Sequence, residues 1–198
     1  MQKVDIPKMI EPSLKKILQY PRELEQFMAF MVKNNVRSYL EIGIGSGHLV
    51  KFIRDAMQLD RVYACDIRDP GTMEGISFFN GNCYSDEYLT WRRSIGLIDM
   101  VFVDSVHTIK HIRADYSREK SFPHRFLAFH DIGHKRYSDL KQFWGNEVPQ
   151  PKIRFVNNNL RDTLIALRGY NRKALFAYHT KYGRRCGIGV CWSDQSPC

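Results

Sequence analysis

The sequence of 198 residues contains no long apolar run. A helix that crosses a bilayer needs about 20 consecutive apolar residues, and no stretch of this chain comes close to that length. The opening residues, MQKVDIPKMIEPSLKK, also lack the apolar core of a secretory signal peptide. These absences predict a protein that neither associates with a membrane nor is exported, and we expect it to be cytoplasmic.

Cysteine is scarce, and the five cysteines of the chain form no C-x-x-C pair. The missing pair argues against a zinc ribbon and against a thioredoxin-type redox site. An odd number of cysteines without an export signal indicates reduced thiols. The H-E-x-x-H pattern of zinc proteases, a serine nucleophile elbow and a Walker lysine loop are missing as well, which excludes three further enzyme classes.

Negative charge is in the minority. The chain has 30 Lys and Arg against 21 Asp and Glu, a formal net charge of +9, and such an excess favours an anionic partner. Basic residues cluster at 92–93, 134–136, 168–173 and 181–185, with tyrosines and a phenylalanine near the last two. This pattern suits RNA or a phosphorylated substrate, and it equally suits a solvated basic face.

Apolar segments typical of strands alternate along the chain with segments of helical periodicity. The strands are predicted at 36–42, 61–66, 75–80, 98–104 and 125–131, and helices at 22–33, 49–57, 86–94, 109–116 and around 140–144. Buried strands separated by helices indicate an α/β, Rossmann-like, doubly wound and mostly parallel sheet. Later segments are predicted as strands at 152–156, 176–179 and 187–192 and as a short helix at 162–167. Two of the late strands would form an antiparallel edge and complete a seven-stranded sheet.

No repeat or linker divides the chain, so we expect one domain over residues 1–198. Within it, residues 1–35 would form an N-terminal arm or helix, 36–132 the ligand-binding core, and 133–198 the substrate side and the C-terminal strands. The predicted core strands end in Gly43, Asp66, Asp104 and Asp131. Because ligands of doubly wound sheets bind beyond the carboxyl ends of the strands, these residues mark the expected site.

Three alternating glycines follow the first core strand, in the pattern E-x-G-x-G-x-G from Glu41 to Gly47. The dinucleotide fingerprint is G-x-G-x-x-G and holds a pyrophosphate, whereas here His48 takes the place of its third glycine. An acid at Glu41 would repel a pyrophosphate and attract a cationic ligand. Asp66, at the end of the next strand, is placed to accept ribose hydroxyls.

The segments YLEIGIGSG, VYACDIR, FFNGNCYSD, IDMVFVDSVH and FLAFHDI, in this order, resemble the class I S-adenosylmethionine-dependent methyltransferases. The resemblance covers roughly residues 36–132. It implies S-adenosylmethionine as cofactor, with Gly43, Gly45 and Gly47 passing beneath its methionine and ribose. It also implies that Glu41 lies near the methionine ammonium group, directly or through water.

The same resemblance assigns the other side of the cofactor. Asp66 would bind the ribose hydroxyls, and Ile67 would pack on the adenine. Asn82 replaces the acid that usually contacts the adenine amino group, and its side-chain oxygen still accepts a hydrogen bond. Asp104, after the fourth strand, would also border the cofactor.

The sequences DSVH and HDI narrow the resemblance to the metal-dependent O-methyltransferases and the related cephalosporin-hydroxylase-like group. This implies a divalent metal held by Asp104, Asp131 and His130, with Asp104 and His107 in catalysis and His107 as general base. A cation on the acceptor oxygen lowers the pKa of the hydroxyl, and histidine takes a proton near neutral pH. Magnesium prefers oxygen ligands, so His130 either favours a transition metal or lies outside the ligand shell.

From these residues we expect a methyltransferase that acts on a hydroxyl of a small, sugar-like or natural-product acceptor. A nucleic-acid methyltransferase is the first alternative, favoured by the basic charge, although no N-P-P-Y motif for base methylation occurs. The second is an interaction module that binds the cofactor without catalysis. A homo-oligomer is compatible with the sequence, which does not identify the acceptor.

Overall fold

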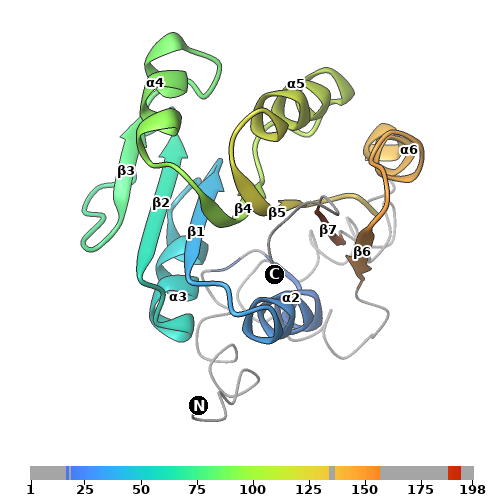
Figure 1. Cartoon of the computed structure of the whole chain (residues 1–198), viewed down its shortest axis with the longest axis horizontal. Coiled ribbons are helices and arrows are strands. Elements are labelled where there is room, and N and C mark those ends of the chain that lie inside the picture. The colour runs from blue at the N-terminus through green and yellow to red at the C-terminus, as the bar shows by residue number, and fades with distance from the viewer. Residues whose placement is uncertain (1–16, 18, 134–136, 157–186, 193–198) are drawn as a thin grey trace, which may run out of the picture.

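The structure, a computed structural model, describes residues 17, 19–133, 137–156 and 187–192. Seven strands form one sheet in the order β3-β2-β1-β4-β5-β7-β6 (Figure 1). The strands are β1 Ser38–Ile42, β2 Arg61–Asp66, β3 Ser77–Asn80, β4 Ile98–Val103, β5 His124–Phe129, β6 Lys152–Phe155 and β7 Ile188–Cys191. The helices are α2 Pro21–Lys33, α3 His48–Met57, α4 Asp86–Ser94, α5 Ile109–Lys120 and α6 Ser138–Asn146. The predicted helix 162–167, the predicted strand 176–179 and the basic clusters 134–136, 168–173 and 181–185 lie outside the described residues.

The sheet is mostly parallel, as predicted. β1 pairs in parallel with both β2 and β4, and the parallel ladder extends to β3 on one side and β5 on the other. β7 runs antiparallel to β5 and to β6, which confirms the antiparallel edge. The mostly parallel part buries both faces, as expected for strands that read as nearly continuous apolar runs.

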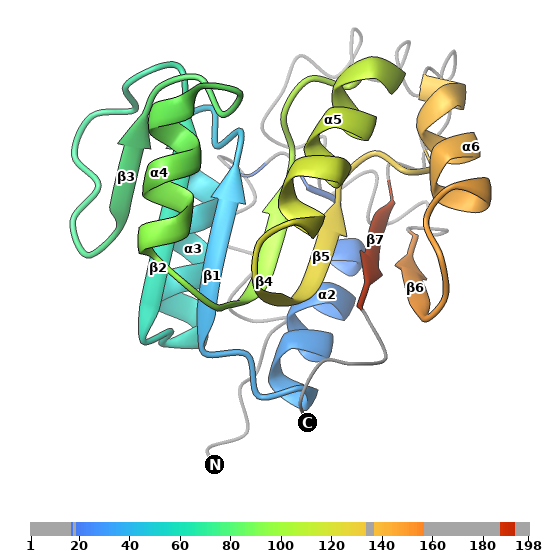
Figure 2. The ribbon, with the colours of Figure 1, turned by 45° about the horizontal axis from the view of Figure 1, so that its top comes forward.

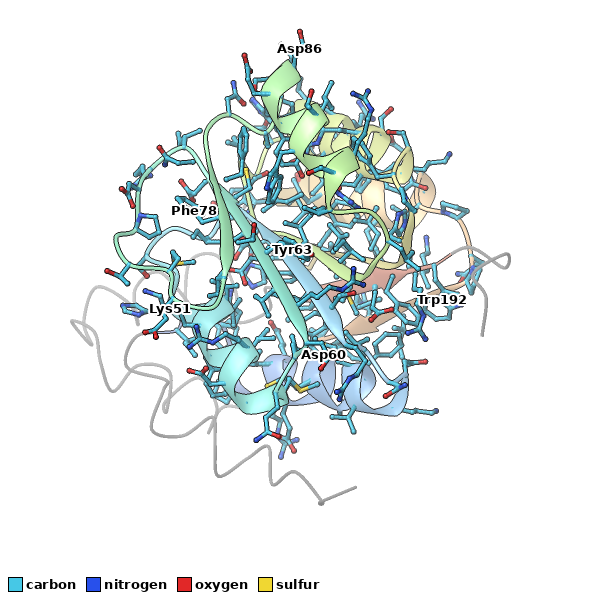
Figure 3. All side chains as sticks on the ribbon, turned by 60° about the vertical axis from the view of Figure 1, so that its left-hand side comes forward. Lys51, Asp60, Tyr63, Phe78, Asp86 and Trp192 are labelled. Atoms are coloured by element: carbon cyan, nitrogen blue, oxygen red, sulfur yellow. The ribbon has the colours of Figure 1, made fainter. Side chains whose placement is uncertain are left out.

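Helices cover both faces of the sheet, with α2 and α3 on one face and α4, α5 and α6 on the other (Figure 1). Successive strand residues point to opposite faces. Tyr39 and Met100 accordingly pack with α2 and α3, whereas Leu40 and Val101 pack with the other three helices. In the edge-on view of Figure 3, side chains fill the space on both sides of the strands. No helix among the described residues is both long and apolar enough to cross a bilayer.

Helices α4 and α5 are joined by an ion pair that is closed off from solvent. Arg92 Nε lies 3.0 Å from Glu119 Oε2, and both side chains are 0% exposed. The Tyr88 hydroxyl donates to the other carboxylate oxygen of Glu119 at 2.9 Å. Arg92 therefore belongs to the interior of the protein, so of the basic pair predicted at 92–93 only Arg93 is exposed.

The carboxyl ends of the parallel strands all lie at the same end of the sheet (Figure 2). The chain passes from β1 outward to β2 and β3, and then returns to β4 on the other side of β1. The neighbouring ends of β1 and β4 thus form the switch point at which such sheets bind ligands. β5 ends at Phe129 rather than at the predicted residue 131. The difference arises because the chain leaves the extended conformation at Asp131, where φ is +59°.

Candidate active site

A cavity of about 580 Å³ lies at the switch point. Its walls are the glycine loop at 43–46 and the segments 65–68 after β2, 81–84 after β3 and 104–107 after β4. The volume falls in the range of roughly 300–1,000 Å³ typical of small-molecule and cofactor sites. The cavity is therefore where the sequence predicts a cofactor.

Most of the residues predicted to bind the cofactor line this cavity, namely Glu41, Gly43, Gly45, Asp66, Ile67, Asn82 and Asp104. Gly47 does not line it. Instead, Gly47 precedes the first residue of α3 with a φ of +71°, a conformation that favours glycine. The third glycine of the loop thus starts the helix.

Gly43 is needed because two strand ends approach each other closely. Its φ is +86°, and a Cβ atom on it would lie 2.5 Å from the backbone oxygen of Asp104. A side chain at this position would push the β4 segment away from the end of β1. The glycine thus brings Asp104 to the cavity.

The carboxylate of Asp66 is fixed by two backbone N–H groups. Gly45 N donates to Oδ2 at 2.8 Å and Arg68 N donates to Oδ1 at 2.9 Å. An ionised carboxylate has about four acceptor sites, so each oxygen can accept a further hydrogen bond. Ile67 beside it is 70% exposed, an apolar surface suited to a flat aromatic ring.

Asn82 and Tyr84 form the opposite wall. The Asn82 Oδ1 accepts the N–H of Tyr84 at 3.0 Å, which holds the side chain in a tight turn and leaves a second lone pair on this oxygen. The guanidinium of Arg118 lies 4.9 Å from the centre of the Tyr84 ring. Tyr84 was not among the residues predicted for the site.

Glu41 is only 2% exposed. The Tyr39 hydroxyl donates to its Oε2 at 2.8 Å. Burial, together with the charges of Asp104 and Asp66, raises the pKa of Glu41 to about 8, against the opposing effect of the Tyr39 hydrogen bond and the charge of His130. Tyr39 was missed in the sequence, although residues two apart on a strand share a face.

A cluster of polar side chains, the Asp104 cluster, lies at the wall of the cavity and is formed by Asp104, His107 and His130. Asp104 Oδ1 lies 3.0 Å from His107 Nε2 and 3.2 Å from His130 Nδ1. The other oxygen, Oδ2, accepts a hydrogen bond from Gln19 Nε2 at 3.1 Å. One ligand atom from each of Asp104, His107 and His130 lies within 4.8 Å of the others, close enough to hold one metal ion.

Asp131 lies beside this cluster. Its Oδ2 is 3.4 Å from His107 Nδ1 and its Oδ1 is 3.6 Å from His130 Nδ1. Asp131 and His130 are 6% and 7% exposed. Within the described part of the chain, His130 Nε2 and Asp131 Oδ1 have no hydrogen-bond partner. The structure thus brings together all four residues predicted for metal binding and catalysis.

The charges of the cluster shift its pKa values strongly. Burial alone would raise the pKa of Asp104, but the charge of His130 and hydrogen bonds from both histidines lower it well below its usual range. Burial alone would lower the pKa of the histidines, but Asp104 and Asp131 raise the pKa of His130 to about 10 and that of His107 in the same direction. The cluster therefore favours positive charge, from protons or from a cation.

Two further parts of the site come from distant segments that hold none of the predicted site residues. Gln19, which is 85 residues from Asp104, and Ile17 line the cavity ahead of α2. The Tyr137 ring, at the start of α6, lies 5.0 Å from that of His107. No motif marks these residues, because only the folded chain places them at the site.

No protein-family model matches the chain, and no curated protein matches its sequence. Its structure matches an O-methyltransferase from Bacillus cereus solved with S-adenosylhomocysteine, with a TM-score of 0.55 and 11% identity over 98% of this chain and 92% of that one. The chain has the fold of a class I methyltransferase. A putative O-methyltransferase from Klebsiella pneumoniae has the same fold. It matches with a TM-score of 0.55 and 10% identity over 97% of this chain and 91% of that one.

A third similar structure holds a metal. The MycE methyltransferase of the mycinamycin biosynthetic pathway, solved with Mg and S-adenosylhomocysteine, matches with a TM-score of 0.54 and 18% identity over 66% of this chain. The present chain spans only 38% of the length of MycE. These likenesses confirm the fold expected from the sequence.

Proposed function

We propose that this protein is an enzyme that transfers the methyl group of S-adenosylmethionine to a hydroxyl group of a small molecule. The observation that carries the proposal is the cavity at the β1–β4 switch point, which joins the predicted cofactor residues to the Asp104 cluster. The shared fold supports it, because two of the similar proteins described above were solved with S-adenosylhomocysteine, the product of such a transfer.

The charges along the cavity suit this cofactor. S-adenosylmethionine carries an ammonium and a sulfonium group, and it has no pyrophosphate. Glu41 lies on the β1 side of the cavity, where its carboxylate would bind the ammonium group, and the glycine loop lets the ligand approach the backbone. Asp66 would accept the ribose hydroxyls, with Ile67 and Asn82 beside the adenine.

The Asp104 cluster would act on the acceptor. An alcohol is a weak nucleophile until it loses its proton, and imidazole groups are suited to remove it near neutral pH. The sequence predicts a divalent cation on Asp104, His130 and Asp131, with His107 as the general base. The clustered donors and the buried atoms without partners fit a cation. When bound, the cation would lower the pKa of the acceptor hydroxyl and fix its position.

The acceptor class is proposed from the same comparison. MycE was also solved with mycinamycin VI, which supports a sugar-like or natural-product acceptor for this chain. Tyr137 and His107 would then border the acceptor, since their rings adjoin on the α6 side of the cluster. Placing the hydroxyl against the methyl group would supply much of the rate enhancement.

Calorimetric titration with S-adenosylmethionine tests the cofactor assignment. Asp66→Ala removes a carboxylate whose hydrogen bonds are worth about 1.5–3 kcal/mol each, so the loss of even one of them should weaken binding by roughly 10- to 100-fold. Asp69→Ala is the matched control, because Asp69 is exposed, lies three residues further on and does not line the cavity. Absence of binding to the unmodified protein, or equal binding by both variants, would contradict the proposal.

The other predictions stay open. Of the basic clusters that favoured nucleic acid, Arg92 is buried and three lie outside the described residues, so no described contact favours the nucleic-acid or the non-catalytic alternative. The cytoplasmic location also stays a prediction. The single domain and the homo-oligomer remain predictions.

A further inference from the structure

We propose that Asp104, His107 and His130 are the ligands of the cation site, that Asp131 orients His107 from outside the ligand shell, and that the site selects a first-row transition-metal ion over Mg²⁺. The inference rests on the proposed function, since it names the metal of that same site. It changes two roles predicted from the sequence: His107 becomes a ligand instead of the general base, and Asp131 becomes a positioning residue instead of a ligand.

The spacing of the ligand atoms fits a single bound ion. Around an ion with ligand bonds of about 2.1 Å, neighbouring ligand atoms lie roughly 3.0–3.4 Å apart in octahedral or tetrahedral geometry. The two distances from Asp104 Oδ1, 3.0 Å to His107 Nε2 and 3.2 Å to His130 Nδ1, fall within this range. The three ligand atoms lie within 4.8 Å of one another, so one ion can reach them all.

The two nitrogens of His107 face two different carboxylates. Nε2 faces Asp104, and Nδ1, across the ring, faces Asp131 Oδ2 at 3.4 Å. A carboxylate on the far nitrogen of an imidazole ligand is a common way to fix its tautomer and orientation. With both nitrogens turned toward carboxylates, His107 has no free nitrogen to serve as general base.

The backbone of Asp131 agrees with this role. Its φ of +59° is uncommon for a residue other than glycine. Such conformations persist where the surrounding structure holds them and are frequent at functional sites. The buried carboxylate is held next to His107, while the adjacent His130 reaches Asp104.

Gln19 completes the arrangement on the other side. Its amide donates to Asp104 Oδ2 at 3.1 Å, and its side chain is buried. This hydrogen bond occupies the oxygen that faces away from the histidines and leaves Oδ1 for the ion. Gln19 is therefore a positioning residue that favours coordination through one oxygen of Asp104.

The ligand types decide which metal binds. Two imidazoles and one carboxylate suit Zn²⁺, Fe²⁺ and other transition metals, and this combination also occurs in non-haem iron sites. Mg²⁺ takes oxygen ligands, usually carboxylates and waters, and dehydrates reluctantly. A site with one protein carboxylate oxygen therefore holds Mg²⁺ weakly.

The sharpest test counts the imidazoles on the ion. The full-length protein is stripped of metal, loaded with one equivalent of Cu²⁺ without cofactor or acceptor, and measured by pulsed electron paramagnetic resonance. We expect two coordinated imidazoles in the unmodified protein, one in His107→Gln, and two in Asp131→Asn. His124→Gln is the matched control and should retain both, because His124 begins β5, far from the strand ends that form the site. Circular dichroism checks that each variant is folded.

Each alternative result has a definite meaning. One imidazole in the unmodified protein, unchanged by His107→Gln, would overturn the inference in favour of Asp131 as ligand. Calorimetry should show Zn²⁺ binding at least 100-fold tighter than Mg²⁺, and His130→Asp should reduce this preference at least tenfold; an unchanged ratio would contradict it. Absence of metal binding would also overturn the inference, whereas separate binding of S-adenosylhomocysteine would leave the proposed cofactor intact.

Discussion

At the scale of single residues, Glu41 should make cofactor binding depend on pH. Its raised pKa of about 8 means that it is mostly neutral at pH 6.5, and a cationic ammonium group favours the ionised carboxylate. The proton must leave before or during binding, so affinity should rise as pH increases through 8. We expect S-adenosylmethionine to bind the metal-free protein about tenfold more tightly at pH 8.5 than at pH 6.5, measured by calorimetry.

The groups around Glu41 make a control necessary. Tyr39 lies beside it on β1, and charges act on it from Asp66 at the end of β2, from Asp104 directly after β4 and from His130 directly after β5. Glu41→Gln removes only the carboxylate and should bind more weakly with a much flatter pH profile. An equally steep profile in this variant would assign the dependence to another group.

The positions of site residues were predictable where a short segment carries them. Glu41, Asp66 and Ile67 stand next to strand ends in the sequence, and all three line the cavity. Gly47 was also predicted to line it but does not. A glycine pattern in the sequence does not distinguish a glycine that contacts a ligand from one that starts a helix. Gln19 carries no local signal, since its hydrogen bond to Asp104 depends on how α2 packs.

At the scale of elements, the ion pair between α4 and α5 should be essential for stability. Arg92→Met would remove one of the two ion-pair partners of the buried Glu119, which keeps Arg118 Nε at 2.9 Å from its Oε1. Because a buried charge left with no partner typically costs about 3–5 kcal/mol, we expect a loss of about 2–3 kcal/mol here. Arg93→Met is the matched control on the next, exposed position and should change stability by less than about 0.5 kcal/mol. Urea unfolding of both variants measures the difference, and equal stabilities would show that Arg92 is dispensable.

The same pair shows what periodicity and composition miss. Helix 86–94 was predicted over the residues that form α4, yet a count of basic residues treated Arg92 as part of a surface. Whether a charged side chain is buried depends on a partner 27 residues away. Strand ends were less certain than strand cores: the predicted strand ran to residue 131, whereas β5 stops at Phe129, two residues before the turn at Asp131.

At the scale of the whole molecule, the alternation of strands and helices was sufficient to predict the parallel sheet, and the late strand segments added the prediction of its antiparallel edge. The alternation works because each buried strand needs a covering helix on one face or the other. The alternation does not predict which residues bind the metal. Four candidate residues come together from the segments that follow β4 and β5, namely Asp104, His107, His130 and Asp131. Which nitrogen faces which carboxylate follows from the packing.

Binding of S-adenosylhomocysteine should stabilise the protein against thermal unfolding, whereas a dinucleotide should not. S-adenosylhomocysteine at 100 times its dissociation constant should stabilise the protein by about 2.7 kcal/mol, which for a chain of this size raises the melting temperature by roughly 5–10 °C. NAD⁺ at the same concentration should produce no shift at pH 8.5, because ionised Glu41 repels a pyrophosphate in the cavity. Asp66→Ala should reduce the shift caused by S-adenosylhomocysteine. Equal shifts with both ligands would mean that the glycine loop recognises only the adenosine they share, and that Glu41 does not select between them.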